Sequence, residues 1–327
     1  NLITGNSPGN DMRFYVEKCE AMRNFCNKIW NASRFVMMNL TIDHVELPKK
    51  LELEDKWILS KLNTLIADVT ENLDKYELGV AVQKIYDFIW DTYCDWYIEL
   101  TKTRLNGTDE DAKLTAQNVL CYVLVTLLKL LHPFMPFITE EIYQALPKCD
   151  GAEDILMTAQ WPEYTEALSF PAEESAMEAV MDLIRAIRAR RAEMNVPPSK
   201  KAELMIVTDQ AEPYQQGLHF IQRLAYASNV TFPETAPADV TGLVSVVTHD
   251  ATAYLPLSEL VDLAAERERI AKELEKAKNG LRITEGKLAN KKFVAHAPEN
   301  VVNAEREKVA KYQELIAKLE ESAKAMA

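Results

Sequence analysis

The chain has 327 residues, 48% of them hydrophobic, which is enough for two or three domains with apolar cores. Its formal net charge of −13 excludes a protein that coats nucleic acid indiscriminately, so any contact with RNA must come from local patches. No apolar run reaches eighteen residues and the first residues do not resemble a signal peptide, which indicates neither a membrane span nor export.

The cysteine and glycine patterns also exclude several kinds of site. Five cysteines stand at wide spacings without a CxxC pair, which argues against a disulfide framework and against a zinc ribbon. The nine glycines form neither a GxGxxG nor a GxxxxGKS/T loop that would cradle phosphates. We therefore expect a cytoplasmic protein with no metal site and no catalytic residues in this chain.

The first predicted helix covers residues 10 to 40 and contains the run NFCNKIWNASRFVMM. Apolar and small residues recur in it at steps of three and four, which predicts a buried stripe made of Cys19, Met22, Cys26, Ile29, Ser33 and Val36. Asn27, Asn31 and Arg34 then share a different face. Asparagine is a poor helix former, so its repeated use inside this helix calls for a reason.

Two interpretations of this polar face remain open. Amides and a guanidinium beside an aromatic such as Trp30 or Phe35 are the groups that read unstacked RNA bases, through polar edges and through stacking. Alternatively, the amides join the helix ends to neighbouring loops.

Four further helices are predicted at residues 53–76, 78–104, 109–131 and 136–146, joined by short loops. The spacing places Trp57 among the inward residues of the second helix. The third helix carries a row of large aromatics at helical spacing, which favours a core role over base stacking. Together these elements predict a mainly α fold that begins with an antiparallel five-helix bundle.

The pattern weakens between Pro147 and Pro171 and then changes to that of a small α/β domain. Helices are predicted at residues 173–195 and 210–228, and strands at residues 202–207, 229–232, 242–249 and 252–257. The first of these helices carries Arg185, Arg188 and Arg191 at steps of three. This row is either a phosphate-binding stripe or a salt-bridged face that complements the helix dipole.

From Leu260 onward the apolar residues follow heptads in two registers separated by NKKFVAHAPENV, which predicts a C-terminal antiparallel two-helix coiled-coil hairpin. Between Lys278 and Lys292 five basic residues face one acid, Glu285, a local balance of +4. A basic segment on such an arm suits contact with a phosphate backbone. Charge that serves only solubility is the alternative.

Several runs of residues resemble one family. NFCNKIWNASRF, with GNDMRF upstream and LLHPFMPFITEEIYQAL downstream, resembles the helical anticodon-binding domain of class I valyl-tRNA synthetases, and GKLANKKFVAHAPENVVNAEREK is similar to the C-terminal arm of that family. The resemblance implies a bundle that recognises the anticodon and an arm that touches the outer corner of tRNA. It divides the chain into residues 1–160 (bundle), 161–257 (α/β domain) and 258–327 (arm).

The resemblance also suggests individual contact residues. Arg34 and Trp57 match positions that contact the anticodon, to which the helical face adds Asn27 and Asn31. For tRNA phosphates and the elbow, the arm and the arginine row supply the candidates Arg185, Arg188, Arg191, Arg282, Lys287, Lys291, Lys292 and Lys308.

The family joins valine to tRNA(Val) with ATP, but its HIGH and KMSKS signatures are absent from this chain. We therefore expect the catalytic and editing domains, with ATP and magnesium, on a missing N-terminal portion, and no cofactor and no aminoacylation here. The expected partner is tRNA(Val), with no membrane and no DNA. A protein–protein interaction or dimerisation scaffold built on the helices and the coiled coil is the alternative function.

Overall fold

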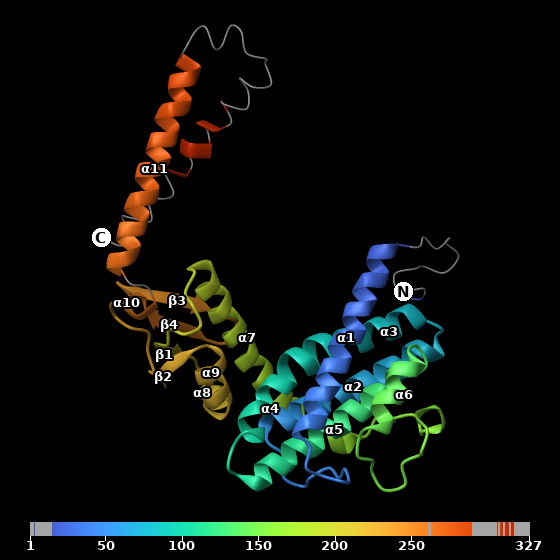
Figure 1. The fold of residues 1–327 in the computed structure, drawn as a ribbon. Coiled ribbons are helices and arrows are strands. Elements are labelled where there is room, and N and C mark those ends of the chain that lie inside the picture. Colours follow the sequence, from blue (N-terminus) through green and yellow to red (C-terminus); the bar gives the residue numbers. More distant parts are fainter. Residues whose placement is uncertain are drawn as a thin grey trace. The chain divides into compact units, whose positions relative to one another are not determined.

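The computed structural model describes residues 3, 15–260, 263–289, 306, 308, 309, 311–313, 315 and 316. Among these residues helices dominate, and they are accompanied by one four-stranded sheet (Figure 1). The chain forms two compact units. The first comprises Asn1–Leu183 with Gln210–Ile221, and the second comprises Ile184–Asp209 with Gln222–Ala327.

The first unit begins with the helices that the sequence predicts. They are α1 (Val16–Asn39), α2 (Leu53–Asp74), α3 (Leu78–Asp87), η1 (Phe88–Tyr97), α4 (Ile98–Leu105), α5 (Glu110–Leu131) and α6 (Pro136–Gln144). The elements α3, η1 and α4 follow one another without a break and together make the predicted third helix. Its middle part, η1, has the wider π-helical hydrogen-bond register.

Local sequence explains where these helices start. At α2, the Glu52 side chain accepts from the backbone N–H of Asp55 and the Asp55 side chain accepts from that of Glu52, which forms a reciprocal capping box. At α5, the Asp109 carboxylate accepts a hydrogen bond from the Ala112 N–H at 3.1 Å. Helix α6 begins at Pro136, where a missing N–H costs nothing.

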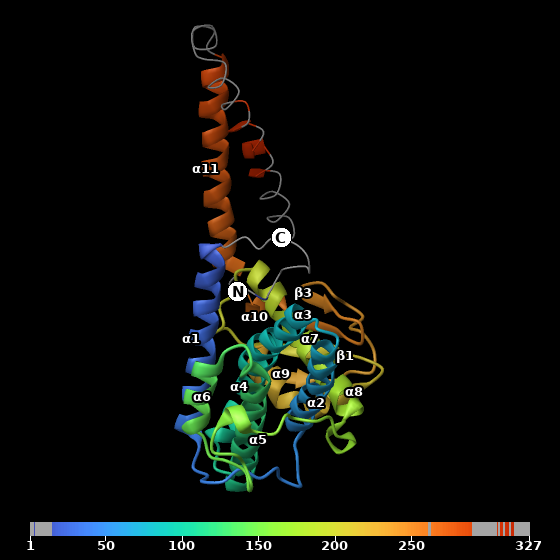
Figure 2. The same cartoon turned by 90° about the vertical axis from the view of Figure 1, so that its right-hand side faces the viewer.

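Helix α5 is the apolar centre of the first unit and packs against α1, α2, α3, α4 and α6 (Figures 1 and 2). Among the described residues it is the one helix long and apolar enough to cross a membrane by length and composition. However, 67% of that apolar window is buried inside the protein, as expected of a core helix.

The segment after α6 is fixed to α2 by polar contacts. The Asn63 amide donates to the Thr165 carbonyl at 2.8 Å and accepts from the Thr165 N–H at 2.9 Å. The Ser60 hydroxyl accepts from the Phe170 N–H, and Trp161 donates from its indole to Thr70. This segment contains two short 3-10 helices, η2 (Leu156–Thr158) and η3 (Glu166–Leu168), and α7 (Pro171–Glu193) follows it.

The strands belong to the second unit and pair in the order β2-β1-β4-β3. They are β1 (Ala202–Val207), β2 (Ala227–Thr231), β3 (Leu243–Val247) and β4 (Thr252–Pro256). Strand β1 runs parallel to β2 and antiparallel to β4. The helical residues between β1 and β2 form α8 (Ala211–Gln216) and α9 (Leu218–Leu224). Buried residues alternate along β1, with Ala202, Leu204 and Ile206 inside, which confirms the predicted period of two.

The C-terminal part begins with the short helix α10 (Leu257–Leu260), followed by α11 (Leu263–Ala289). Ala277 on α11 is buried and packs with Leu274, Tyr312 and Ile316. All four occupy predicted heptad positions. At Gly280 on α11, an added Cβ would lie 2.7 Å from the Tyr312 ring, so α11 and the backbone that carries Tyr312 approach closely there.

Candidate nucleic-acid interface

The polar face of α1 lies at the surface. Asn27, Asn31 and Arg34 are all exposed, as their helical spacing predicts. Two large apolar side chains accompany them, because Trp30 is 40% and Met38 is 79% exposed. Side-chain amides, a guanidinium and an exposed indole on one helix provide both hydrogen-bonding edges and a stacking surface.

The opposite face of α1 holds the helix in place. Ile29, Ser33 and Val36 are buried, and the Ser33 hydroxyl donates to the Ile29 carbonyl at 2.8 Å, which satisfies its polar group inside the core. Phe25 is also buried, although the predicted stripe omitted it, whereas Cys26 is only half-buried. The apolar face therefore fixes which side of α1 faces solvent.

An aromatic cluster joins α1 to the third helix. The Phe25 ring lies 4.5 Å from that of Tyr86, and Tyr86 lies 5.8 Å from Trp90 between ring centroids. The Lys28 ammonium stands 4.9 Å from the Trp90 ring centroid and 2.6 Å from an Asp95 oxygen. These aromatics pack against one another, which fits the core role predicted for the row.

One exposed cation on α1 was missed by the sequence analysis. Arg23 is exposed and precedes Arg34 by eleven residues, which is close to three full helical turns. It therefore lies on the same face as Arg34, about 16 Å along the helix. The eleven-residue spacing was the signal that would have identified it.

The loop from α1 to α2 is attached to α5 and borders a groove. The Thr41 N–H and hydroxyl both donate to the Gln117 amide oxygen, at 3.0 and 3.1 Å, and the Glu46 N–H donates to Asn118 at 2.8 Å. The groove has a volume of about 600 Å³ and is lined by residues from 46 to 52 and from 109 to 118. Its acids Glu46, Glu52, Asp109 and Asp111 outnumber Lys49 and Lys50. By charge it does not favour phosphate.

The structure corrects the expectation for Trp57. Its side chain is only 1% exposed and lies among the buried residues of α2. The inward position given by helical periodicity was therefore right, and the surface role given by resemblance was wrong. Burying so large an indole removes much apolar area from water, which explains why this residue faces the core. Trp57 is not available to contact a base directly.

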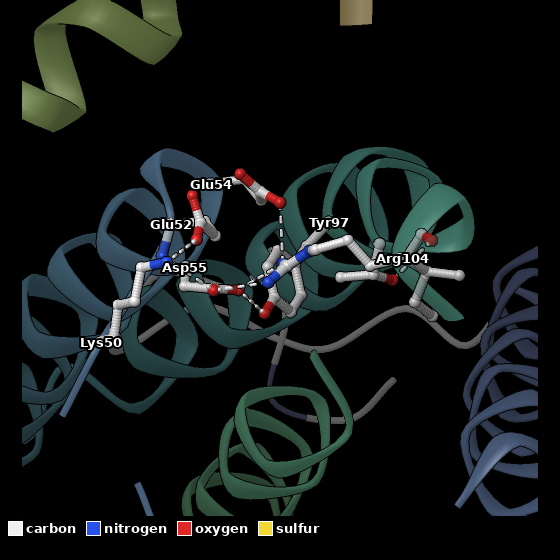
Figure 3. A network of polar contacts seen from close by, with 8 residues as sticks. Lys50, Glu52, Glu54, Asp55, Tyr97 and Arg104 are labelled. Atoms are coloured by element: carbon white, nitrogen blue, oxygen red, sulfur yellow. Dashed lines mark hydrogen bonds and ion pairs between the residues drawn. The ribbon is translucent and has the colours of Figure 1, made fainter. Parts of the chain in front are cut away.

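Close to Trp57 in sequence, a buried ionic network connects the start of α2 to α4 (Figure 3). The Arg104 guanidinium donates to both oxygens of Asp55, at 2.8 and 2.6 Å, and lies 2.8 Å from a Glu54 oxygen. The Tyr97 hydroxyl donates to the same Asp55 carboxylate at 2.7 Å. The network thus ties the start of α2, where the α1–α2 loop ends, to α4.

The protonation state of this network follows from its burial. Burial raises the pKa of Glu54 to about 7, against the opposing charge of Arg104 and with help from that of Asp55. Burial also raises the pKa of Tyr97 well above its usual range. For Arg104 burial acts in the opposite direction, but the hydrogen bond to Asp55 and the two carboxylates raise its pKa overall. One guanidinium therefore serves two carboxylates, and Glu54 is the one that takes up a proton near neutrality.

The arginine row on α7 is divided by the structure. Arg185 and Arg188 are exposed, but Arg191 is only 3% exposed. The Arg191 guanidinium donates to the carbonyls of Pro197 and Lys200 and lies 5.3 Å from the Tyr226 ring centroid. Burial lowers its pKa. The prediction that Arg191 binds phosphate was therefore wrong, because its side chain is buried and its Nη2 donates to the loop that leaves α7.

The basic candidates of the arm are only partly described. Arg282 is exposed and donates to the Asn279 side chain at 3.0 Å, while Lys287 and Lys308 are exposed. Lys291 and Lys292 lie outside the described residues. Within α11, the buried or half-buried positions Leu274, Ala277, Leu281 and Thr284 leave the basic side chains on the outer faces.

Comparison with known proteins defines the class. Residues 55–206 match the family model described as the anticodon-binding domain of tRNA ligase. Residues 262–327 match the valyl tRNA synthetase tRNA binding arm. Both matches are to domains of aminoacyl-tRNA synthetases, which defines the class to which this chain belongs.

The curated relatives specify which aminoacyl-tRNA synthetase family this is. The chain is 49% identical to the valine-tRNA ligase of Clostridium acetobutylicum over 98% of its length, and 49% identical to that of Clostridium perfringens over 96%. It is 46% identical to the enzyme of Carboxydothermus hydrogenoformans over 95%. The chain therefore belongs to the valyl-tRNA synthetase family. It spans about 36% of the length of these relatives and corresponds to their C-terminal part.

Among solved structures, a LeuRS-tRNA complex from Agrobacterium radiobacter covers 64% of this chain and 22% of its own chain. The sequence identity is 14% and the TM-score is 0.35, a likeness too low to support an argument.

Proposed function

We propose that this chain is the tRNA-recognition portion of a valine-tRNA ligase, with tRNA(Val) as its partner. The observation that carries the proposal is the exposed face of α1, where amides and a guanidinium that need no partner within the fold stand beside an exposed indole. Helix interiors rarely tolerate repeated asparagines without a compensating role. The matches to an anticodon-binding domain and to a tRNA-binding arm support the same conclusion.

In this proposal the regions have separate tasks. Residues 1–160 form the antiparallel five-helix anticodon-binding bundle, residues 161–257 the α/β domain, and residues 258–327 the coiled-coil hairpin. Packing of Ala277 with Tyr312 and Ile316 supports the hairpin, because it brings together two stretches separated by about 35 residues of helix and connection. The polar contacts between α2 and residues 161–170 tie the start of the second region to the first.

Recognition of the anticodon is assigned to Asn27, Asn31 and Arg34. Asparagine can pair with a base through both a donor and an acceptor, and arginine can pair in a bidentate way or stack on a base face. Trp30, beside them, offers the stacking surface. Arg23 extends this face by a further cation.

Contacts with phosphates and the tRNA elbow are assigned to seven remaining cations. They are Arg185, Arg188, Arg282, Lys287, Lys291, Lys292 and Lys308. On a chain with a net charge of −13, most of the surface repels a polyanion, so these patches orient the RNA as well as hold it.

In the longer ligase, binding energy collected by this chain positions the tRNA acceptor end at a remote catalytic centre. We propose that valine activation with ATP and magnesium, and editing, take place on the preceding part of the cytoplasmic enzyme. The chain alone then binds tRNA(Val) but transfers no valine. Valine attachment to tRNA by the purified chain would refute this assignment.

The first test is binding of tRNA(Val) to the purified chain at increasing salt. RNA held by cations is released as ionic strength rises, whereas a hydrophobic coiled-coil contact between protein chains is not. The apolar seam at Ala277 is already covered by residues of the same chain, which argues against the scaffold alternative. Salt-resistant self-association without tRNA binding would favour the scaffold.

The second test separates base reading from general attraction. Arg34→Ala should reduce the preference for the valine anticodon over others by about 1–3 kcal/mol if its guanidinium reads a base. Lys75→Ala is the matched control, because Lys75 is also an exposed cation of the first unit but pairs with Glu71 at 2.5 Å. Equal loss for every tRNA with Arg34→Ala would mean that Arg34 contacts only the backbone.

A further inference from the structure

The turn between α2 and α3 presents an apolar patch that the fold does not cover. Tyr76 is 88%, Leu78 43% and Val80 47% exposed, within five consecutive residues. Ile3, also exposed at 38%, lies against the same turn, since an added Cβ on Gly79 would be 3.0 Å from the Ile3 carbonyl oxygen. We call Ile3, Tyr76, Leu78 and Val80 the turn patch.

Tyr76 has a backbone conformation that is unusual for its residue type. Its φ is +60°, and the Tyr76 and Glu77 N–H groups donate to Leu73 and Asn72 at 3.0 and 2.8 Å, which closes the helix in a Schellman motif. Glycine is the usual residue at this position, and a bulky side chain there is strained. The ring gains little from its own fold, because it is almost fully exposed. Strain at an exposed aromatic points to a contact outside the described fold.

The charges around the turn patch indicate what kind of surface it meets. Glu71, Asp74 and Glu77 are all exposed, and the nearby cation Lys75 is paired with Glu71. This acidic rim repels a phosphate backbone, so RNA is disfavoured. An exposed tyrosine with aliphatic neighbours and a charged rim has the composition of a protein–protein contact with a central anchor.

The contact of Ile3 with the turn indicates which protein surface covers the turn patch. The chain matches the C-terminal part of its relatives and spans about 36% of their length, so in such a relative the remaining polypeptide precedes the position that Ile3 occupies. We propose that the turn patch is the docking surface for the preceding part of the ligase polypeptide, with Tyr76 as its anchor. The inference depends on the family assignment but not on tRNA binding.

The experiment compares the full-length ligase with the chain of residues 1–327 by amide hydrogen exchange. In the full-length ligase, exchange in the peptide from 72 to 82 should be slower by about tenfold or more, because docking suppresses local opening of the turn. Equal exchange in the two proteins would overturn the proposal. Protection that appears only on adding tRNA would show that RNA is the occupant, and protection that grows with concentration of the chain alone would show a second copy.

One substitution should have opposite effects in the two proteins. Tyr76→Gly relieves the positive φ, so the unfolding midpoint of the chain alone should rise or stay unchanged. In the full-length ligase the same change should abolish the protection of the peptide from 72 to 82. Phe137→Ser, which removes an 89% exposed aromatic on α6, is the control and should leave that peptide unchanged. Retained protection in the Tyr76→Gly ligase would show that Tyr76 is not the anchor.

Binding of tRNA(Val) to the Tyr76→Gly chain separates this proposal from the proposed function. Undiminished tRNA binding is expected, since the turn patch is acidic. Reduced tRNA binding with an intact fold would contradict the assignment of the patch to a protein partner.

Discussion

Replacing Glu54 by glutamine should change how the stability of the first unit depends on pH. Glu54 is 2% exposed and shares the Arg104 guanidinium with Asp55. Its folded-state pKa of about 7 lies above the ordinary glutamate pKa of 4.5. The folded chain therefore binds a proton more readily than the unfolded chain across this interval. Consequently, this residue favours folding below pH 4.5 and loses that contribution as the pH rises towards 7.

The size of the effect follows from the two pKa values. A shift from 4.5 to about 7 corresponds to about 3 kcal/mol of unfolding free energy, lost as the carboxyl ionises in its buried site. Glutamine keeps a carbonyl oxygen that can accept from Arg104 but does not ionise. The Glu54→Gln chain should therefore gain stability relative to the parent, by about 3 kcal/mol, between pH 4.5 and pH 8.

Tryptophan fluorescence during urea unfolding measures this difference in the right part of the molecule. All five tryptophans, Trp30, Trp57, Trp90, Trp96 and Trp161, lie in the first unit, so the signal does not mix the two units. Other groups also titrate, so the quantity to compare is the difference between the Glu54→Gln and parent chains at each pH.

A matched control and a clear negative result complete the test. Glu71→Gln removes a carboxylate whose side chain is 63% exposed, and it is the matched control for loss of a surface charge. If the Glu54→Gln difference were the same at pH 4.5 and pH 8, the pKa of Glu54 would not be raised in the folded chain. The claim that burial outweighs the attraction of Arg104 would then be wrong.

Two further predictions compare matched pairs of variants. Gly217→Ala should destabilise the chain by about 1–3 kcal/mol, because the new Cβ would lie 2.7 Å from a methyl carbon of Val180. Gly286→Ala meets open space and should stabilise α11 by about 0.5–1 kcal/mol. Thermal unfolding followed by circular dichroism measures both changes. Arg191→Met should cost about 1–3 kcal/mol and leave tRNA affinity unchanged, whereas Arg188→Met, at an exposed position, should lower affinity with little effect on stability.

Periodicity predicted the helices and strands well, because burial imposes it directly. The inward positions of Ile29, Ser33 and Val36 follow from steps of three and four, and the buried faces of the strands follow from alternation. The π-helical register of η1 could not be predicted, since it depends on how the aromatics of the third helix pack against other helices.

The candidate site was predictable only in part. The exposure of Asn27 and Arg34 follows from the helix face alone. The prediction for Arg191 was wrong because its acceptors, the carbonyls of Pro197 and Lys200, lie in a loop whose path no periodic pattern gives. The Arg104 network was also missed, because Arg104 stands 49 residues from Asp55 and 50 from Glu54 in the chain and meets them only through folding.

The salt dependence of tRNA binding can determine how many of the assigned cations make contact. Each neutralised phosphate contributes about 0.7 to 0.9 to the steepness of the plot of log affinity against log salt. If all seven assigned cations touch phosphates, the slope should be about −5 to −6, and a slope near −2 would limit the contacts to two or three. Removing Lys287, Lys291 and Lys292 together should then flatten the slope by about 2 to 3. An unchanged slope would remove these three lysines from the interface and leave the other assigned cations to hold the RNA.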